Sequence, residues 1–152
     1  MSDSSILAAE RANKAGEGHL PGLLGLDFKE IGSGRVVAEL TVKARHRTPH
    51  GYLHAATVTA LADTAAGYGA LASLPQGAES FTTINLQCSF LGTAREGTIR
   101  TEATLRHGGR NTQVWDAEVA DGNGKTIAIF RCTQMILWPR GGGAAAGHGP
   151  RS

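Results

Sequence analysis

The chain of 152 residues lacks any run of about 18 apolar residues, the length that a membrane-spanning helix requires. Residues 1–11 also lack the basic region and apolar stretch that together mark a secretory signal. From these two absences we expect no membrane partner and no export, and therefore a cytoplasmic protein.

A strong charge of one sign is missing as well. The net charge is +2 with the histidines counted neutral, whereas proteins that bind nucleic acids usually carry a concentrated basic surface. Hydrophobic residues make up 41% and charged residues 18%, a globular composition at a length suited to one ordinary domain. We expect a single core and no nucleic-acid partner.

Cysteines are few, and common catalytic motifs are absent. Cys88 and Cys132 match no metal-ligand spacing and lie in alternating apolar segments, so we expect buried reduced thiols, with a disulfide as the alternative. No histidine pair has a metal spacing supported by other ligands, so we expect no metal and no cofactor. The sequence contains no Gly-x-Ser-x-Gly, dinucleotide or P-loop motif.

The residue pattern along the chain predicts two helices and six strands. Helices are expected over 4–15 and 55–74, and strands over 23–31, 35–43, 80–91, 98–106, 110–120 and 125–138. Asp121-Gly122-Asn123-Gly124 is typical of a hairpin turn. We expect a helical segment over 1–18, one domain over 19–139 and a disordered Gly- and Ala-rich tail over 140–152.

This order of elements favours an α+β architecture in which an antiparallel sheet of five to six strands curls around one long central helix. Helix 55–74 is small on nearly every side and can approach a sheet closely, while Gly67, Gly69 and Ala70 would leave room for a ligand. Strict alternation over 80–91 predicts that Cys88 and Thr83 lie on opposite faces of their strand.

Asp63 is the strongest candidate for chemistry. It lies in the middle of the most apolar helix, where an ionised carboxylate must be exposed, paired or functional. A solvent-facing position or a structural ion pair is the alternative to a catalytic role.

The start of the same helix offers a second candidate group. The backbone N–H groups of Ala55 and Ala56 fall where a helix leaves N–H groups without internal partners, so they would suit a developing oxyanion. His54 precedes them, with helix capping or loop packing as the alternative. His46 and His50 are loop histidines with the same alternative.

Arg106 and Arg110 flank a connection between two strands, around the double glycine 108–109. Arginine matches the geometry of phosphate oxygens, so this segment is a candidate for phosphate binding. A plain polar hairpin turn is the alternative.

Segment 51–65 (Gly-Tyr-Leu-His-Ala-Ala-Thr-Val-Thr-Ala-Leu-Ala-Asp-Thr-Ala) resembles the signature of hot-dog thioesterases of the phenylacetate-degradation (PaaI) and Arthrobacter-type 4-hydroxybenzoyl-CoA kinds. That signature reads Gly-x-x-His-Gly-Gly, six residues, then an acidic residue on the central helix. His54 and Asp63 keep its nine-residue offset. The resemblance extends over about residues 20–138.

The resemblance implies an acyl-CoA thioesterase that needs no metal or organic cofactor. Asp63 would act as general base or nucleophile, the Ala55 N–H would hold the oxyanion, and His54 would position the thioester. Substrate contacts are expected from Ala56, Thr64, Tyr68, Arg106 and Arg110. Tyr68 could stack on an aromatic acyl group, with simple packing in the core as the alternative. The family further implies a homodimer or homotetramer with active sites at the dimer interface.

Two positions depart from the family pattern. Ala55-Ala56 replaces Gly-Gly, which preserves the N–H groups provided that no glycine-only conformation is required. Thr48 stands where many members have Gln or Asn, and we hypothesise that Thr48 or His50 partly takes that role. These departures leave a non-catalytic acyl-CoA-binding module as an alternative. A hot-dog dehydratase or hydratase is a further one, although its His-Phe-Pro loop is absent.

Overall fold

Residues 2–141 are described by the structure, a computed structural model of the chain. The helices are α1 (Asp3–Ala15), α2 (Leu20–Leu24), α3 (Ala55–Ala72) and a 3-10 turn at Ala44–His46, and the strands are β1 (Leu26–Gly32), β2 (Arg35–Thr41), β3 (Ser80–Phe90), β4 (Thr98–Gly108), β5 (Thr112–Ala120) and β6 (Thr126–Leu137). The predicted tail over 140–152 lies almost wholly outside the described residues.

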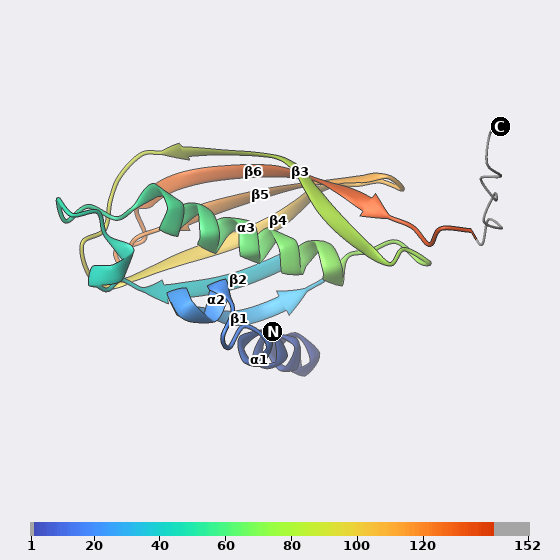
Figure 1. Cartoon of the computed structure of the whole chain (residues 1–152), viewed down its shortest axis with the longest axis horizontal. Coiled ribbons are helices and arrows are strands. Elements are labelled where there is room, and N and C mark those ends of the chain that lie inside the picture. The colour runs from blue at the N-terminus through green and yellow to red at the C-terminus, as the bar shows by residue number, and fades with distance from the viewer. Residues whose placement is uncertain (1, 142–152) are drawn as a thin grey trace, which may run out of the picture.

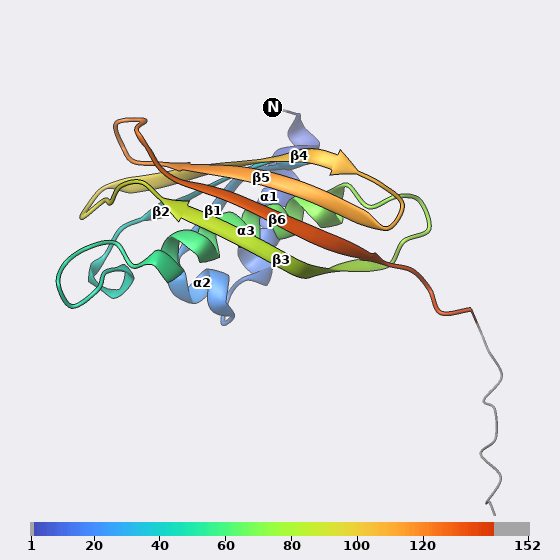
Figure 2. The same ribbon diagram turned by 90° about the horizontal axis from the view of Figure 1, so that it is seen from above.

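The strands form one antiparallel sheet in the order β1-β2-β4-β5-β6-β3, which curls around α3 (Figures 1 and 2). The predicted α+β hot-dog architecture, with six strands around a central helix, is confirmed. Each of the six strands contacts α3, so the whole sheet packs on this helix.

The sheet meets α3 through the apolar faces that the alternation predicts. Trp115 and Val119 of β5 are fully buried, as are Ile99 of β4 and Val36 of β2. On the helix side the contact is made largely by alanine and glycine, and Gly69 lies directly against the Trp115 ring. The close approach expected of a helix with small side chains is therefore realised, and Gly69 faces the sheet instead of leaving room for a ligand.

The prediction of a strand over 23–31 is wrong at its start. Residues Leu20–Leu24 form α2, with Pro21 in its first turn, and β1 begins at Leu26. Proline is well suited to the first turn of a helix, and Gly25, with φ of 80°, ends α2 in the left-handed conformation. The apolar spacing of this segment fits a short helix as well as a strand.

The two edges of the sheet are protected differently. α1 packs on β1, and the Asn13 side chain accepts a hydrogen bond from Phe28 N–H at 2.8 Å and donates one to Phe28 O at 3.1 Å. β3, at the opposite edge, has no strand beyond it among residues 2–141, and Ile84 and Phe90 on it are 55% and 47% exposed. An uncovered apolar edge strand is suited to pairing with another chain.

β3 carries a bulge. Thr83 pairs with Gln134 and Asn85 pairs with Thr133, so that Ile84 between them has no partner on β6. A bulge shifts the alternation of side chains by one residue.

Because of this shift, the same face of β3 holds odd-numbered residues before the bulge and even-numbered ones after it. Thr83 and Cys88 are paired with Gln134 and Phe130, which are both fully buried on the face toward α3. The strict alternation predicted over 80–91 is therefore wrong, and Thr83 shares the inner face with Cys88.

Candidate active site

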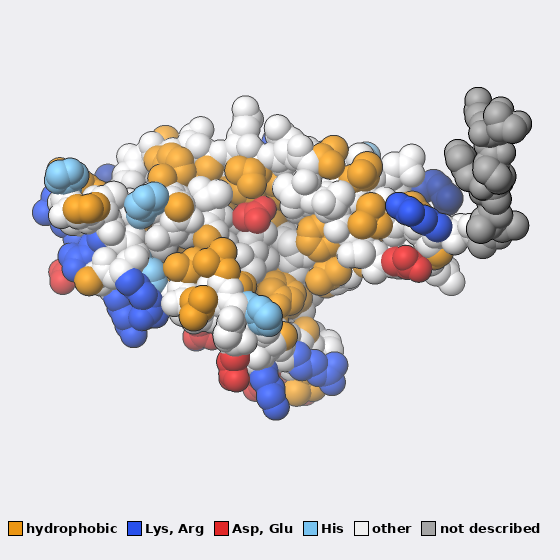
Figure 3. Space-filling model, viewed as in Figure 1, with side chains coloured by type: hydrophobic (Ala, Val, Ile, Leu, Met, Phe, Trp, Pro, Cys, Tyr) orange, Lys and Arg blue, Asp and Glu red, His pale blue; other side chains and the backbone are white. Residues whose placement is uncertain are grey.

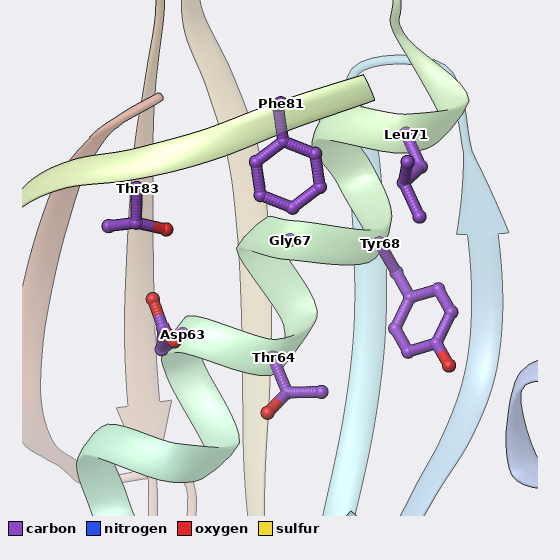
Figure 4. A pocket seen from close by; sticks show the side chains of 7 residues that line it. All are labelled: Asp63, Thr64, Gly67, Tyr68, Leu71, Phe81 and Thr83. Atoms are coloured by element: carbon purple, nitrogen blue, oxygen red, sulfur yellow. The ribbon is translucent and has the colours of Figure 1, made fainter. Parts of the chain in front are cut away.

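Asp63 lies half-way along α3 and lines a cavity of about 280 Å³ between that helix and β3 (Figure 4). The other residues around this cavity are Thr64, Gly67, Tyr68, Leu71, Phe81 and Thr83. Most of these lining residues are apolar or small. We call the space that they enclose the Asp63 cavity. Figure 3 shows the same face, where hydrophobic side chains gather along α3 and β3 around an acidic group.

The surroundings of Asp63 favour its protonated form. Its Oδ1 atom is buried and has no hydrogen-bond partner among the described residues. Burial raises the pKa of the Asp63 carboxyl above its ordinary value, because a charged carboxylate loses solvation that no protein donor replaces. A carboxylate with a raised pKa in a cavity is typical of a group that accepts and releases protons. Of the alternatives weighed from the sequence, the structural ion pair is not found among the described residues.

Neither cysteine is suited to act as a nucleophile. Cys132 is fully buried, and burial, followed by the nearby Asp63 charge, raises the pKa of its thiol to about 12. Burial also raises the pKa of Cys88. Both cysteines are free thiols, as predicted, but the prediction that both are buried is wrong for Cys88, which is only partly buried. Both thiols stay protonated at neutral pH.

His54 caps the start of α3. Its Nδ1 atom accepts a hydrogen bond of 2.9 Å from the Ala56 N–H, so the proton of the ring sits on Nε2. His54 therefore caps the helix through Nδ1, which is the alternative role that the sequence left open. The rest of its side chain is exposed.

Ala55 and Ala56 adopt ordinary helical backbone, since no described non-glycine residue has a positive φ. The N–H groups at the helix start are therefore present without glycine. The Ala56 N–H is taken by His54, whereas the Ala55 N–H has no hydrogen-bond partner among residues 2–141. The free donor lies at the positive end of the helix dipole.

A buried histidine holds the helix start in place. His46 is 1% exposed, its Nδ1 accepts from Lys43 N–H at 2.9 Å, and its Nε2 donates to Leu24 O at 2.6 Å. The His46 carbonyl in turn accepts from His54 N–H at 2.9 Å and from the Thr57 hydroxyl at 3.1 Å. His46 is thus a structural residue, in line with the alternative role weighed for it.

The structure does not bring His54 and Asp63 together within one chain. His54 and Ala56 line a separate depression of about 270 Å³ with Leu20, Leu24, Arg45, Thr57 and Ala60. The eight steps from Ala55 to Asp63 correspond to about 12 Å along the helix axis, at a rise of about 1.5 Å per residue. A base and an oxyanion donor must each lie within about 3 Å of the reacting atoms, so one chain alone separates them too widely.

The loop before α3 places the other two predicted residues differently. The Thr48 N–H donates to Tyr52 O at 2.7 Å and the Thr48 carbonyl accepts from Gly51 N–H at 2.9 Å, which closes a tight turn. The Thr48 hydroxyl oxygen is buried without a partner among the described residues, whereas His50 is exposed. Thr48 is therefore the more constrained of the two.

Arg106 and Arg110 lie away from the Asp63 cavity. Arg106 is 3.5 Å from Asp116 on the outer face of the sheet, where Arg131 binds the same carboxylate. The Arg110 guanidinium stacks on the Trp138 ring at 4.5 Å from its centroid. A single chain therefore does not bring either arginine to Asp63, and their phosphate-binding role stays a prediction.

Thr64 and Tyr68 line the Asp63 cavity, and their binding of substrate stays a prediction. The Thr64 hydroxyl donates to Ala60 O at 2.6 Å, and the Tyr68 ring packs edge-on against Phe28 at 4.8 Å between centroids. Packing against β1 holds the Tyr68 ring at one end of the cavity, beyond Gly67 in Figure 4.

Sequence reasoning missed the contribution of β3, namely Phe81 and Thr83. Phe81 lies against Gly67, where an added Cβ would come to 3.3 Å from its ring. The side chain of Thr83 reaches the cavity because of the bulge, which no alternation pattern reveals. A possible signal was Gln134, a polar residue in the apolar strand 125–138 that bonds to Thr83.

No helix within residues 2–141 combines the length and the apolar character needed to cross a membrane. In the same part of the chain, no group of three or more His, Cys, Asp and Glu side chains is arranged to hold a metal ion.

Comparison with known proteins defines the class. Residues 50–128 match the family model described as the thioesterase superfamily, which spans more than half of the chain. The sequence is 30% identical over 134 residues to the 1,4-dihydroxy-2-naphthoyl-CoA hydrolase of Escherichia coli strain K12, covering 86% of this chain and 96% of the relative. The chain therefore belongs to the thioesterase superfamily, and the predicted class of thioester hydrolase is confirmed.

Two further relatives are of the kind that the signature resembles. The acyl-coenzyme A thioesterase PaaI of Escherichia coli K12 is 33% identical over 109 residues, covering 71% of this chain and 75% of the relative. The solved structure of the E. coli PaaI protein has a TM-score of 0.75 at 27% identity, covering 88% and 96% of the two chains. A thioesterase from Pseudomonas aeruginosa, with a TM-score of 0.80 at 24% identity and coverage of 85% and 93%, shares the fold.

Proposed function

We propose that this thioester hydrolase acts on acyl-CoA in the cytoplasm and releases a free acid and CoA, with Asp63 as general base. The observation that carries the proposal is the Asp63 carboxylate itself, which lies in an apolar cavity without a protein donor for Oδ1 and has a raised pKa. Relatives named as naphthoyl-CoA and acyl-CoA hydrolases support a CoA thioester as substrate.

The reaction that we propose needs one base and one oxyanion site. Asp63 takes a proton from water as the water oxygen bonds to the thioester carbon, and the carbonyl electron pair moves onto its oxygen. When the tetrahedral intermediate collapses, the carbon–sulfur bond breaks and the Asp63 proton passes to the leaving sulfur. Water and thioester thus become acid and thiol, and the carboxylate is regenerated.

The developing oxyanion would be held at the start of α3. The Ala55 N–H supports this role because it is a free donor at a helix N-terminus. The exposed Nε2–H of His54, fixed in direction by the bond from Ala56 N–H to Nδ1, would donate to the thioester oxygen as it binds.

We further propose that each site is built from two copies of the chain. The axial distance of about 12 Å between Ala55 and Asp63 supports this, since neither group can serve a thioester bound at the other within one chain. The uncovered edge strand β3, which also borders the Asp63 cavity, is the surface that we propose for pairing.

The acyl group would bind in the Asp63 cavity. Phe81, Tyr68 and Leu71 offer apolar contacts, and Gly67 adds no side chain to the cavity. A cavity of about 280 Å³ with two aromatic rings favours an aryl group or a chain of medium length.

The test measures release of free CoA from acetyl-, octanoyl-, palmitoyl-, benzoyl- and phenylacetyl-CoA by the wild type and by Asp63→Asn. We expect benzoyl-, phenylacetyl- or octanoyl-CoA to be cleaved fastest, and the rate to fall by about 10² to 10⁴ in the variant. Glu79→Gln, the same chemical change at an exposed position, is the matched control and should retain wild-type activity. Binding of acyl-CoA without hydrolysis by the wild type would favour the non-catalytic module instead.

A further inference from the structure

A single buried side chain connects α2 to the loop that leads into α3. His46 lies in the 3-10 turn before that loop and has a hydrogen bond at each ring nitrogen. Its Nε2 atom is 2.6 Å from Leu24 O, at the end of α2, and its Nδ1 atom is 2.9 Å from Lys43 N. The ring therefore joins two segments that are 22 residues apart in the chain.

Only one protonation state of this ring satisfies both bonds. The Lys43 N–H can only donate, so Nδ1 must offer a lone pair, and the Leu24 carbonyl can only accept, so Nε2 must carry the proton. Burial lowers the pKa of His46, and the positive charges of Arg45 and Lys43 act in the same direction. The neutral ring with its proton on Nε2 is therefore the form present at neutral pH.

The backbone of His46 holds the start of α3 as well. Its carbonyl accepts from His54 N–H at 2.9 Å and from the Thr57 hydroxyl at 3.1 Å, which closes the loop 47–53. The His54 ring in turn is fixed in direction by the bond from Ala56 N–H. A displacement of His46 would therefore move His54 and the first turn of α3 with it.

α2 forms the wall that faces these donors. Leu20 and Leu24 line the depression of about 270 Å³ together with His54 and Ala56, and Figures 1 and 2 show α2 beside the first half of α3. The helix has only five residues and none of them is buried, so packing alone attaches it weakly. The bond from His46 to Leu24 O is thus an important part of what keeps this wall in place.

We propose that His46 is a positioning residue for thioester hydrolysis. Its bond to Leu24 O keeps α2 against the start of α3, so that His54 and Ala55 present their N–H groups in a depression of fixed shape. This inference rests on the proposed function, in which these groups hold the oxyanion. Donors of this kind lower the barrier only when they are already aimed at the oxyanion and protected from water. Without the bond, α2 would move away and water would compete for both donors.

Two substitutions separate the two bonds of the ring. The amide nitrogen of glutamine is as many bonds from Cα as Nε2 of histidine, so His46→Gln can still donate to Leu24 O but loses the bond from Lys43. The amide oxygen of asparagine corresponds to Nδ1 in the same way, so His46→Asn keeps the Lys43 bond and loses the one to Leu24. If the attachment of α2 matters, the glutamine variant must be the more active of the two.

The first test measures kcat and KM for CoA release from the substrate that the wild type cleaves fastest. Because the oxyanion forms only in the transition state, we expect His46→Asn to lower kcat about 10- to 100-fold with KM within about threefold. His46→Gln should stay within about threefold of the wild-type kcat. His19→Asn, the same change at an exposed histidine whose side chain makes no capping bond, is the matched control and should retain wild-type activity. A wild-type kcat in His46→Asn, or equal losses in both His46 variants, would overturn the proposal.

Amide hydrogen exchange followed by NMR tests the connection without any substrate. Exchange of the His54 and Ala56 N–H groups should become about tenfold faster in His46→Asn, because both depend on the attachment of the helix start, while the last turns of α3 should be unaffected. Unchanged exchange at His54 would overturn the role of His46 whether or not any thioester is hydrolysed. Absence of hydrolysis by the wild type, with the faster exchange present in His46→Asn, instead overturns the proposed function.

Discussion

The Trp115 ring packs directly on Gly69: a Cβ atom at position 69 would come to 2.5 Å from Cη2 of the indole. Trp115 is fully buried, and its Nε1–H donates to Gln113 Oε1 at 2.8 Å, so the ring cannot move away without breaking this bond. The contact sets the distance between α3 and β5 and therefore the position of Asp63, six residues earlier on the same helix.

Gly69→Ala should consequently destabilise the protein. Alanine is the better helix former, but its methyl group would overlap the indole, and overpacking of a core typically costs about 1 to 3 kcal/mol. Chemical denaturation monitored by tryptophan fluorescence measures the free energy of unfolding. A glycine-to-alanine control at Gly97 is not suitable, because Gly97 has a positive φ of 79°, which alanine adopts only with strain. Ala72→Gly, at the exposed end of α3, changes helix propensity without touching Trp115. A Gly69→Ala variant as stable as the wild type would show that β5 can move away from α3 and make room for the methyl group.

Asp63→Asn should make stability less dependent on pH. Because burial raises the pKa of Asp63 in the folded state, the folded chain binds more protons than the unfolded one between the two pKa values. The contribution of Asp63 to stability is therefore fully present below the unfolded pKa of about 3.9 and is lost as the pH rises through the raised value. We expect Tm of the variant to exceed that of the wild type at pH 7, and this difference to shrink toward pH 4. A difference that grows toward pH 4 would contradict the burial of this charge.

Activity should respond to the same titration with the opposite sign. A general base must be ionised, so kcat/KM should rise with pH through an acidic limb lying above the ordinary pKa of an aspartate. Initial rates of CoA release between pH 4 and pH 8 measure this limb. A limb at or below the ordinary aspartate value would assign it to a different group.

The two roles of His54 can be separated by substitution. Asparagine is a strong N-cap residue, so His54→Asn should preserve the stability of α3, whereas His54→Ala should lose about 0.5 to 2 kcal/mol. If the ring also donates to the thioester, both variants should lose activity, which thermal unfolding and CoA release measured on the same samples will reveal. Full activity in His54→Asn would limit His54 to capping.

The two-copy site can be tested by mixing inactive variants. Ala55→Pro removes the free N–H at the first position of α3, where proline fits a helix well, and should lower kcat by about 10² to 10³. When Asp63→Asn and Ala55→Pro chains are unfolded together and refolded, half of the dimers should contain one intact site, giving about a quarter of wild-type activity. No recovery in a mixture that forms mixed dimers would place both groups in one chain.

Much of this protein is determined locally. The alternation in 35–43, 98–106 and 110–120 depends only on which residues avoid water, and each of these strands is found with its apolar face inward. Asp121 begins the expected hairpin turn, where its side chain accepts from the Asn123 and Lys125 N–H groups. An isolated carboxylate in an apolar helix likewise indicated a candidate site, because burying an unpaired charge carries a large free-energy cost.

The composition of the site was decided by tertiary structure. Whether Leu24 belongs to a helix or a strand depends on Pro21 and Gly25, whose conformational limits outweigh the apolar spacing. The face on which Thr83 lies depends on a bulge opposite Gln134, a property of strand pairing that no local pattern records. The sequence by itself determined the fold class and the carboxylate in the middle of the central helix, whereas the residues that surround this carboxylate depend on how distant segments pack.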